Sequence, residues 1–177
     1  MRALGPGSVS SILKVILDVI HFVLWVGAAS IGVGIIAVLL LSARPELVGS
    51  SIHLGRLGVT GPWLAPLAAA GLLAVGLYFA GAIVIVGRLR RIFQTLTAGD
   101  PFQPANVGRL RTIGATLAVL EVGRYVAAAL SHVLFHGRFH FGGGASLTTW
   151  FAVLAIVVLA EVFREGARLR GEAELTI

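Results

Sequence analysis

Residues 12–41 read ILKVILDVIHFVLWVGAASIGVGIIAVLLL, and Lys14, Asp18 and His21 are the only ionisable side chains among them. As an α-helix this stretch is about 45 Å long, whereas the hydrocarbon core of a bilayer is about 30 Å thick. It therefore predicts a transmembrane helix that tilts, or that projects from the membrane at its charged beginning. The apolar run is far longer than that of a signal peptide, so we interpret it as a retained first helix.

Three further apolar stretches, residues 63–86, 110–134 and 147–163, are each long enough to cross a bilayer. The whole chain of 177 residues is 57% hydrophobic and only 12% charged. A soluble domain of this composition would have too little polar surface to cover its core. The sequence therefore predicts an all-α protein, an integral membrane four-helix bundle that forms a single transmembrane domain over residues 1–177.

Small residues four positions apart recur within the predicted spans: Ala28 with Gly32, Gly76 with Ala80, Gly114 with Ala118, and Gly123 with Ala127. Such pairs let helix backbones approach closely in lipid. They favour a compact bundle and a homo-oligomer equally.

The lysines and arginines are unevenly divided among the segments that join the spans. Most lie near the N-terminus, in the connection 87–109 or in the tail 164–177, whereas the two other connections contain only Arg44, Arg56 and Arg138. By the positive-inside rule, both termini and the connection 87–109 are expected to face the cytoplasm. Trp63 and Trp150 then lie at the outer interface, where amphipathic rings are enriched.

The connection 87–109 has a pattern of its own. Its apolar residues recur at helical spacing: Leu89, Ile92, Phe93 and Leu96. Helix two is thus expected to continue into the cytoplasm as an amphipathic extension that stops near Gly99, and Pro104 is well placed to open helix three. Two interpretations remain open. The extension is a basic helix among the lipid headgroups, or it is a docking surface for a cytoplasmic partner, with these candidate residues: Arg88, Arg90, Arg91 and Phe93.

Three of the four spans carry an acid followed three residues later by a base. The spacing places the two side chains on one helix face, where they can pair. We interpret the pairs as a candidate intramembrane polar network: Asp18 with His21, Glu121 with Arg124, and Glu161 with Arg164. Ionisable groups in a span need a partner or a function. Glu121 and Arg124, the deepest pair, are either a structural ion pair or a site for a substrate, an ion or a proton.

His132, His136 and His140 are spaced by four near the outer end of helix three, a weak candidate zinc or copper site. Exposed interfacial histidines are the alternative. The chain has no cysteine, no nucleotide-binding loop and no recognisable catalytic arrangement. The basic residues flank apolar stretches and lack interleaved aromatics, which argues against direct nucleic-acid binding. We therefore expect a non-enzymatic protein without a cofactor.

Two segments resemble a bacterial family of small four-helix membrane proteins that is catalogued as domain of unknown function 2975. The first contains Leu89-Arg90-Arg91-Ile92-Phe93, Gly99-Asp100-Pro101-Phe102 and residues 106–114, and the second contains residues 160–166, Leu169-Arg170, Glu172 and Leu175-Thr176-Ile177. Family members typically have more acid in the tail, where this chain has Gly171 and Ala173. Members often lie beside a small helix-turn-helix regulator, so the resemblance implies the membrane component of a regulatory pair in the bacterial inner membrane.

These observations lead to two functional hypotheses. The first is a non-enzymatic inner-membrane protein whose basic cytoplasmic hairpin and tail contact a helix-turn-helix regulator or a neighbouring subunit. The alternative is a small transporter or channel that uses the buried acid–base pairs.

Overall fold

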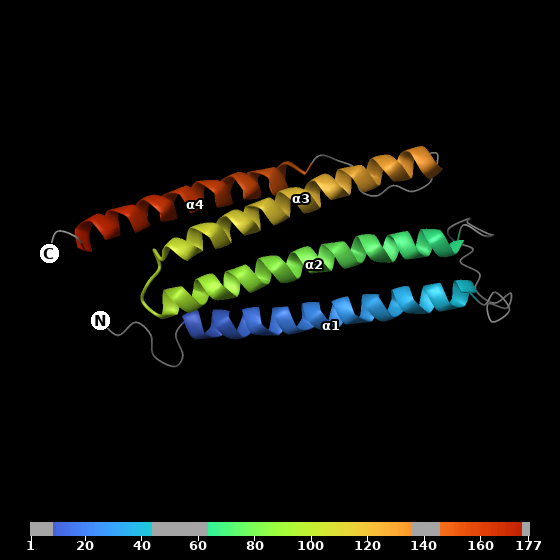
Figure 1. The fold of residues 1–177 in the computed structure, drawn as a ribbon, viewed down its shortest axis with the longest axis horizontal. Coiled ribbons are helices and arrows are strands. Elements are labelled where there is room, and N and C mark those ends of the chain that lie inside the picture. Colours follow the sequence, from blue (N-terminus) through green and yellow to red (C-terminus); the bar gives the residue numbers. More distant parts are fainter. Residues whose placement is uncertain (1–8, 44–63, 136–145, 175–177) are drawn as a thin grey trace. The chain divides into compact units, whose positions relative to one another are not determined.

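The computed structural model describes residues 9–43, 64–135 and 146–174. These ranges form four α-helices: α1 (Val9–Ala43), α2 (Leu64–Thr97), α3 (Pro104–Phe135) and α4 (Leu147–Glu174) (Figure 1). All four helices are long and apolar enough to cross a membrane. The prediction of an all-α protein with four membrane-length helices is therefore confirmed.

The helices expose apolar side chains along most of their length. Phe22, Leu77 and Phe151 are 69%, 68% and 67% exposed. The buried apolar side chains are few by comparison: Leu17, Ile92, Leu110, Ile113 and Ala160. An apolar surface of this extent promotes aggregation in water. Lipid tails are as apolar as these side chains, so the same surface is compatible with a bilayer.

The chain divides into two compact units, which we describe separately. The hairpin unit, His21–Ile83, contains most of α1 and the first part of α2. Within it the ring of Phe79 packs onto Gly27, where an added Cβ would lie 2.2 Å from the ring carbon Cε1. A residue larger than glycine would displace the ring from this position.

The four-helix unit, Met1–Ile20 with Val84–Ile177, contains the beginning of α1, the end of α2, and both α3 and α4. Helices α3 and α4 pack along each other (Figure 1). The core of the unit is a buried apolar cluster contributed by the end of α2, by α3 and by α4: Ile92, Leu110, Ile113 and Ala160. A partly buried layer surrounds the cluster: Ile85, Leu89, Leu117, Ile156 and Phe163.

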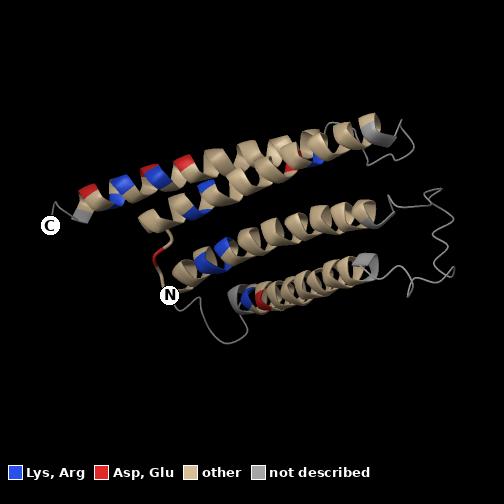
Figure 2. Ribbon diagram, turned by 45° about the vertical axis from the view of Figure 1, so that its right-hand side comes forward, with Lys and Arg blue, Asp and Glu red and all other residues tan. Residues whose placement is uncertain are grey.

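The end of α2 follows the sequence prediction closely. The helix continues beyond the predicted span to Thr97, and Gly99 stops it in the left-handed conformation with a φ of 82°. The backbone N–H of Asp100 donates to the carbonyl of Thr95 at 3.0 Å, which satisfies one of the last carbonyls of the helix. Pro104 is the first residue of α3, as expected. Along the ribbon, arginines mark the last part of α2 and the first part of α3, and an acidic residue lies in the turn between them (Figure 2).

Candidate functional site

The turn between α2 and α3 is organised by a buried asparagine. Asn106 is fully buried, and its amide nitrogen donates to the Thr95 hydroxyl at 2.7 Å and to the Pro101 carbonyl at 3.0 Å. Its amide oxygen accepts from Nη1 of Arg109 at 2.7 Å. A buried amide is stable when its donors and acceptor are satisfied. Asn106 therefore ties the end of α2, the turn and the start of α3 into one folded element.

The same turn is fastened to the C-terminal part of α4. The Phe102 ring packs onto Gly166, where an added Cβ would lie 2.6 Å from ring carbon Cδ1. The ring also contacts the ring of Phe163, with 5.6 Å between their centroids. Asp100 forms an ion pair with Arg170. We call these five residues, Asp100, Phe102, Phe163, Gly166 and Arg170, the clasp.

The clasp joins the two segments that carry the family resemblance. Asp100 and Phe102 belong to the Gly-Asp-Pro-Phe turn, whereas Phe163, Gly166 and Arg170 belong to the tail. The two segments are far apart in the sequence, and neither shows by itself what it contacts. The sequence predicted the turn and the tail as separate cytoplasmic elements. In the structure these two segments contact each other.

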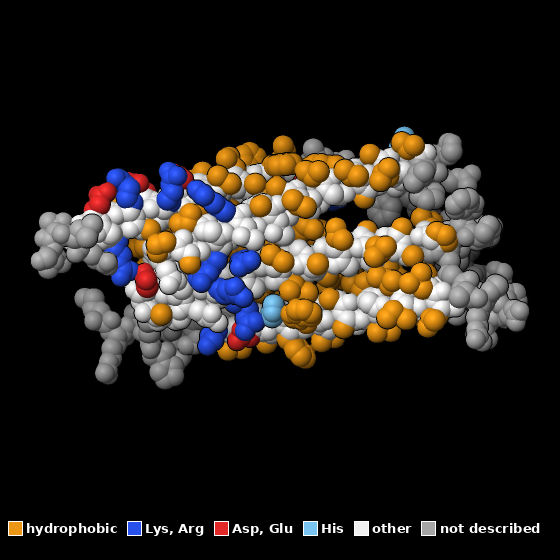
Figure 3. All heavy atoms as spheres, in the orientation of Figure 1, with side chains coloured by type: hydrophobic (Ala, Val, Ile, Leu, Met, Phe, Trp, Pro, Cys, Tyr) orange, Lys and Arg blue, Asp and Glu red, His pale blue; other side chains and the backbone are white. Residues whose placement is uncertain are grey.

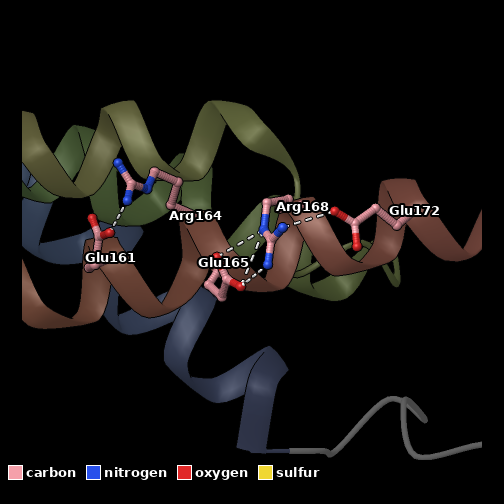
Figure 4. A network of polar contacts seen from close by, with 5 residues as sticks. All are labelled: Glu161, Arg164, Glu165, Arg168 and Glu172. Carbon is pink, nitrogen blue, oxygen red and sulfur yellow. Dashed lines mark hydrogen bonds and ion pairs between the residues drawn. The ribbon is translucent and has the colours of Figure 1, made fainter.

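In addition to the clasp residues, the same part of α4 carries a series of ion pairs on its exposed surface (Figure 4). Glu161 pairs with Arg164, as their three-residue spacing predicts. Arg168 pairs with Glu165 at 2.5 Å and with Glu172 at 3.0 Å. Exposed pairs of this kind contribute little to stability. They balance the charges of this part of α4 and make it a polar helix suited to water.

The second polar site lies further along α3. Glu121 is only 6% exposed, and both of its carboxylate oxygens accept from Arg124, at 2.6 Å from Nη2 and 3.2 Å from Nε. The predicted pairing of these two residues is confirmed. The guanidinium carbon of Arg124 also lies 4.9 Å from the centre of the Tyr125 ring, a cation–π contact.

The adjacent Tyr125 ties this site to the beginning of α4. Its hydroxyl oxygen accepts from the backbone N–H of Ser146 and from the indole N–H of Trp150, each at 3.2 Å. Ser146 caps α4, because its hydroxyl oxygen accepts from the backbone N–H of Thr149 at 3.3 Å. The contacts of Tyr125 thus join the beginning of α4 to α3, next to the Glu121–Arg124 pair.

The pairing expected between Asp18 and His21 is wrong. Asp18 pairs with Arg90 of α2 at 2.6 Å, and Nε2 of His21 accepts from the indole N–H of Trp25 at 3.1 Å. Spacing along one helix aligns two side chains but does not exclude a partner from another helix. Here a guanidinium from the end of α2 reaches the carboxylate, and the imidazole acts as an acceptor. Of the three predicted pairs, the structure thus shows Glu121 with Arg124 and Glu161 with Arg164, whereas Asp18 and His21 have other partners.

The four predicted docking residues divide into two groups. Arg90 and Phe93 line a small pocket beside Lys14 and Asp18 of α1, with room for about one water molecule. Arg88 and Arg91, three residues apart, share another face of α2. Arg91 is exposed, and its carbonyl accepts from Nη1 of Arg109 at 3.2 Å, which links α2 to α3.

The structure describes one of the three histidines proposed as metal ligands. His132 is exposed near the end of α3, whereas His136 and His140 lie outside the described residues. Among the residues that are described, no three His, Cys, Asp or Glu side chains are placed to hold a metal ion.

The sequence reasoning missed Asn106 and Tyr125, and a signal existed for the first. Asn106 is four residues before Leu110 and seven before Ile113, so it lies on the buried face of α3. A polar residue on an apolar stripe needs internal hydrogen-bond partners. Tyr125 gave no such signal, because its partners Ser146 and Trp150 follow the connection between α3 and α4, and the sequence does not show which residues that connection brings close to Tyr125.

Comparison with known proteins places the chain in a family. Neither the curated proteins nor the solved structures contain a match to this chain. The sequence profile of a family described as protein of unknown function (DUF2975) matches residues 52–177, which is well over half of the chain and includes the clasp. The chain therefore belongs to the DUF2975 family.

Proposed function

We propose that the protein is a non-enzymatic, multi-pass protein of the bacterial inner membrane that acts through a cytoplasmic partner. The clasp is the observation that carries this proposal. Two membrane helices can be joined by a short turn alone, yet here α2 continues to Thr97 and α4 continues to Glu174. The two extensions are fastened together by Phe102 on Gly166 and by Asp100 with Arg170. A folded platform at the ends of the spans suits the binding of another protein.

The clasp also bears on the topology of the chain. Because it joins the α2–α3 turn to the end of α4, both elements lie on the same side of any membrane that the helices cross. The abundance of Lys and Arg in the connection 87–109 and in the tail supports the cytoplasmic side. Both termini are then cytoplasmic.

A binding surface for the partner is available on this platform. Leu96, Phe102 and Leu169 are large apolar residues that remain 38%, 39% and 54% exposed. Leu169 is three residues from Gly166, the residue under the Phe102 ring, and so lies on the same side of α4 as this contact. Apolar anchors within a polar rim are typical of protein interfaces. The family resemblance favours a small helix-turn-helix regulator as the partner.

Co-purification in mild detergent with the helix-turn-helix regulator that the family resemblance implies tests the proposal. Leu169→Gln removes an exposed anchor without disturbing the clasp, and Arg111→Gln changes an exposed residue elsewhere in the four-helix unit. The wild type and Arg111→Gln are expected to retain the regulator, whereas Leu169→Gln loses it. Failure of the wild type to form a complex, or equal retention by Leu169→Gln, contradicts the proposal.

A further inference from the structure

A basic patch lies where the beginning of α1 meets the end of α2, within the four-helix unit. It consists of Lys14, Arg88, Arg90 and Arg91 (Figure 3). The ion pair between Asp18 and Arg90 links the two helices and places Lys14, one turn before Asp18, beside α2. Among the described residues, Lys14, Arg88 and Arg91 have no acidic partner, so Asp18 balances only one of the four positive charges.

The arginines of α4 differ from those of the patch. Arg164 pairs with Glu161, Arg168 with Glu165 and Glu172, and Arg170 with Asp100. Positive charge is therefore balanced on α4 and in excess on the patch. The excess charge on the patch is available to an anionic ligand from outside the described part of the chain.

The surroundings of the patch indicate where this ligand comes from. Val15 and Val19, which flank Lys14 and Asp18 on α1, are 61% and 55% exposed. Lys14 lies near the beginning of the apolar stretch 12–41, and Arg88, Arg90 and Arg91 directly follow the apolar stretch 63–86, so the patch is expected at the level of the lipid headgroups. The cations of the patch are then close both to lipid phosphate groups and to exposed apolar side chains of α1. A lipid headgroup reaches them while its acyl chains lie along the exposed valines.

We propose that the basic patch binds the phosphate-bearing headgroup of an anionic phospholipid. Guanidinium groups donate two parallel hydrogen bonds to phosphate oxygens, and Lys14 adds a third positive charge. Clusters of Lys and Arg next to a membrane span attract anionic lipids. This inference goes beyond the proposed function, because the lipid site is separate from the clasp and requires no protein partner.

The test is the retention of phosphatidylglycerol and phosphatidylcholine by the full-length protein in mild detergent, counted by native mass spectrometry. The wild type is expected to retain phosphatidylglycerol in preference to phosphatidylcholine. Each neutralised cation weakens binding of the anionic lipid about fivefold, so Arg88→Gln with Arg91→Gln weakens it about twenty-five-fold. Lys14→Gln, a milder change, weakens it about fivefold.

Arg164→Gln with Arg168→Gln is the matched control, because it removes the same amount of charge from paired arginines of α4. This control is expected to retain phosphatidylglycerol as the wild type does. The proposal is overturned if the wild type shows no preference for phosphatidylglycerol, if the patch variants retain it unchanged, or if the control loses it equally.

Discussion

The contact between Phe102 and Gly166 allows a sharp test of the clasp by a single methyl group. In Gly166→Ala the new Cβ would lie 2.6 Å from Cδ1 and 2.7 Å from Cε1 of the Phe102 ring. Both distances are shorter than real carbon contacts, so the ring has to move away from α4. Gly171 lies on the same helix and has no other atom within 4 Å of the corresponding position. Gly171→Ala is therefore the matched control.

The two variants are expected to differ in stability, with Gly166→Ala the less stable. Replacing a helical glycine by alanine increases the free energy of unfolding by up to about 1 kcal/mol, and this gain is common to both variants. Overpacking costs about 1–3 kcal/mol. Phe102 is 39% exposed and has room to move outward, which places the cost at the lower end of this range. Gly166→Ala should therefore be about 1–2 kcal/mol less stable than Gly171→Ala.

Unfolding of the purified protein in detergent, followed by circular dichroism, measures this difference. Phe102→Ala provides a further control, because without the ring Gly166→Ala should behave as Gly171→Ala does. Equal stability of Gly166→Ala and Gly171→Ala in the presence of Phe102 would refute the contact on which the clasp rests.

Three further predictions concern the polar residues of α3. Asn106→Ala removes three buried hydrogen bonds and should lower the free energy of unfolding by about 2–3 kcal/mol, measured in the same assay. Tyr125→Phe should blue-shift or broaden the fluorescence of Trp150, whose indole N–H loses its acceptor; an unchanged spectrum would contradict that hydrogen bond. Glu121→Gln should lower the melting temperature by more than Glu161→Gln, because Glu121 is buried and Glu161 is 54% exposed. Similar melting temperatures for Glu121→Gln and Glu161→Gln would show that burial of the Glu121–Arg124 pair does not affect stability.

The helices could be predicted from the sequence because their signals are local. Each span is a long, predominantly apolar run, and the stop at Gly99 and the start at Pro104 follow from the backbone preferences of glycine and proline. The pairing of Glu121 with Arg124 is local as well, since both residues lie on one turn of α3. Patterns of this kind depend on a few neighbouring residues and not on how the helices pack.

The partners of residues on different helices could not be predicted in the same way. Asp18 has a base three residues away, yet it pairs with Arg90 from another helix. The clasp depends on Gly166 being opposite Phe102, a register that is set by the packing of α3 on α4. The level at which α4 begins, beside Tyr125, depends on the same packing. The distances between these residues are set by how the helices pack, and the sequence pattern does not reveal that packing.

The central claim is that the α2–α3 turn and the end of α4 form one platform. The chain has no cysteine, so spin labels can be attached at two chosen positions, Asp100→Cys and Arg170→Cys, with the protein in a lipid bilayer. Because these two side chains form an ion pair, the doubly labelled protein should show strong dipolar broadening that neither singly labelled protein shows. A spectrum equal to the sum of the two single-label spectra would contradict the account.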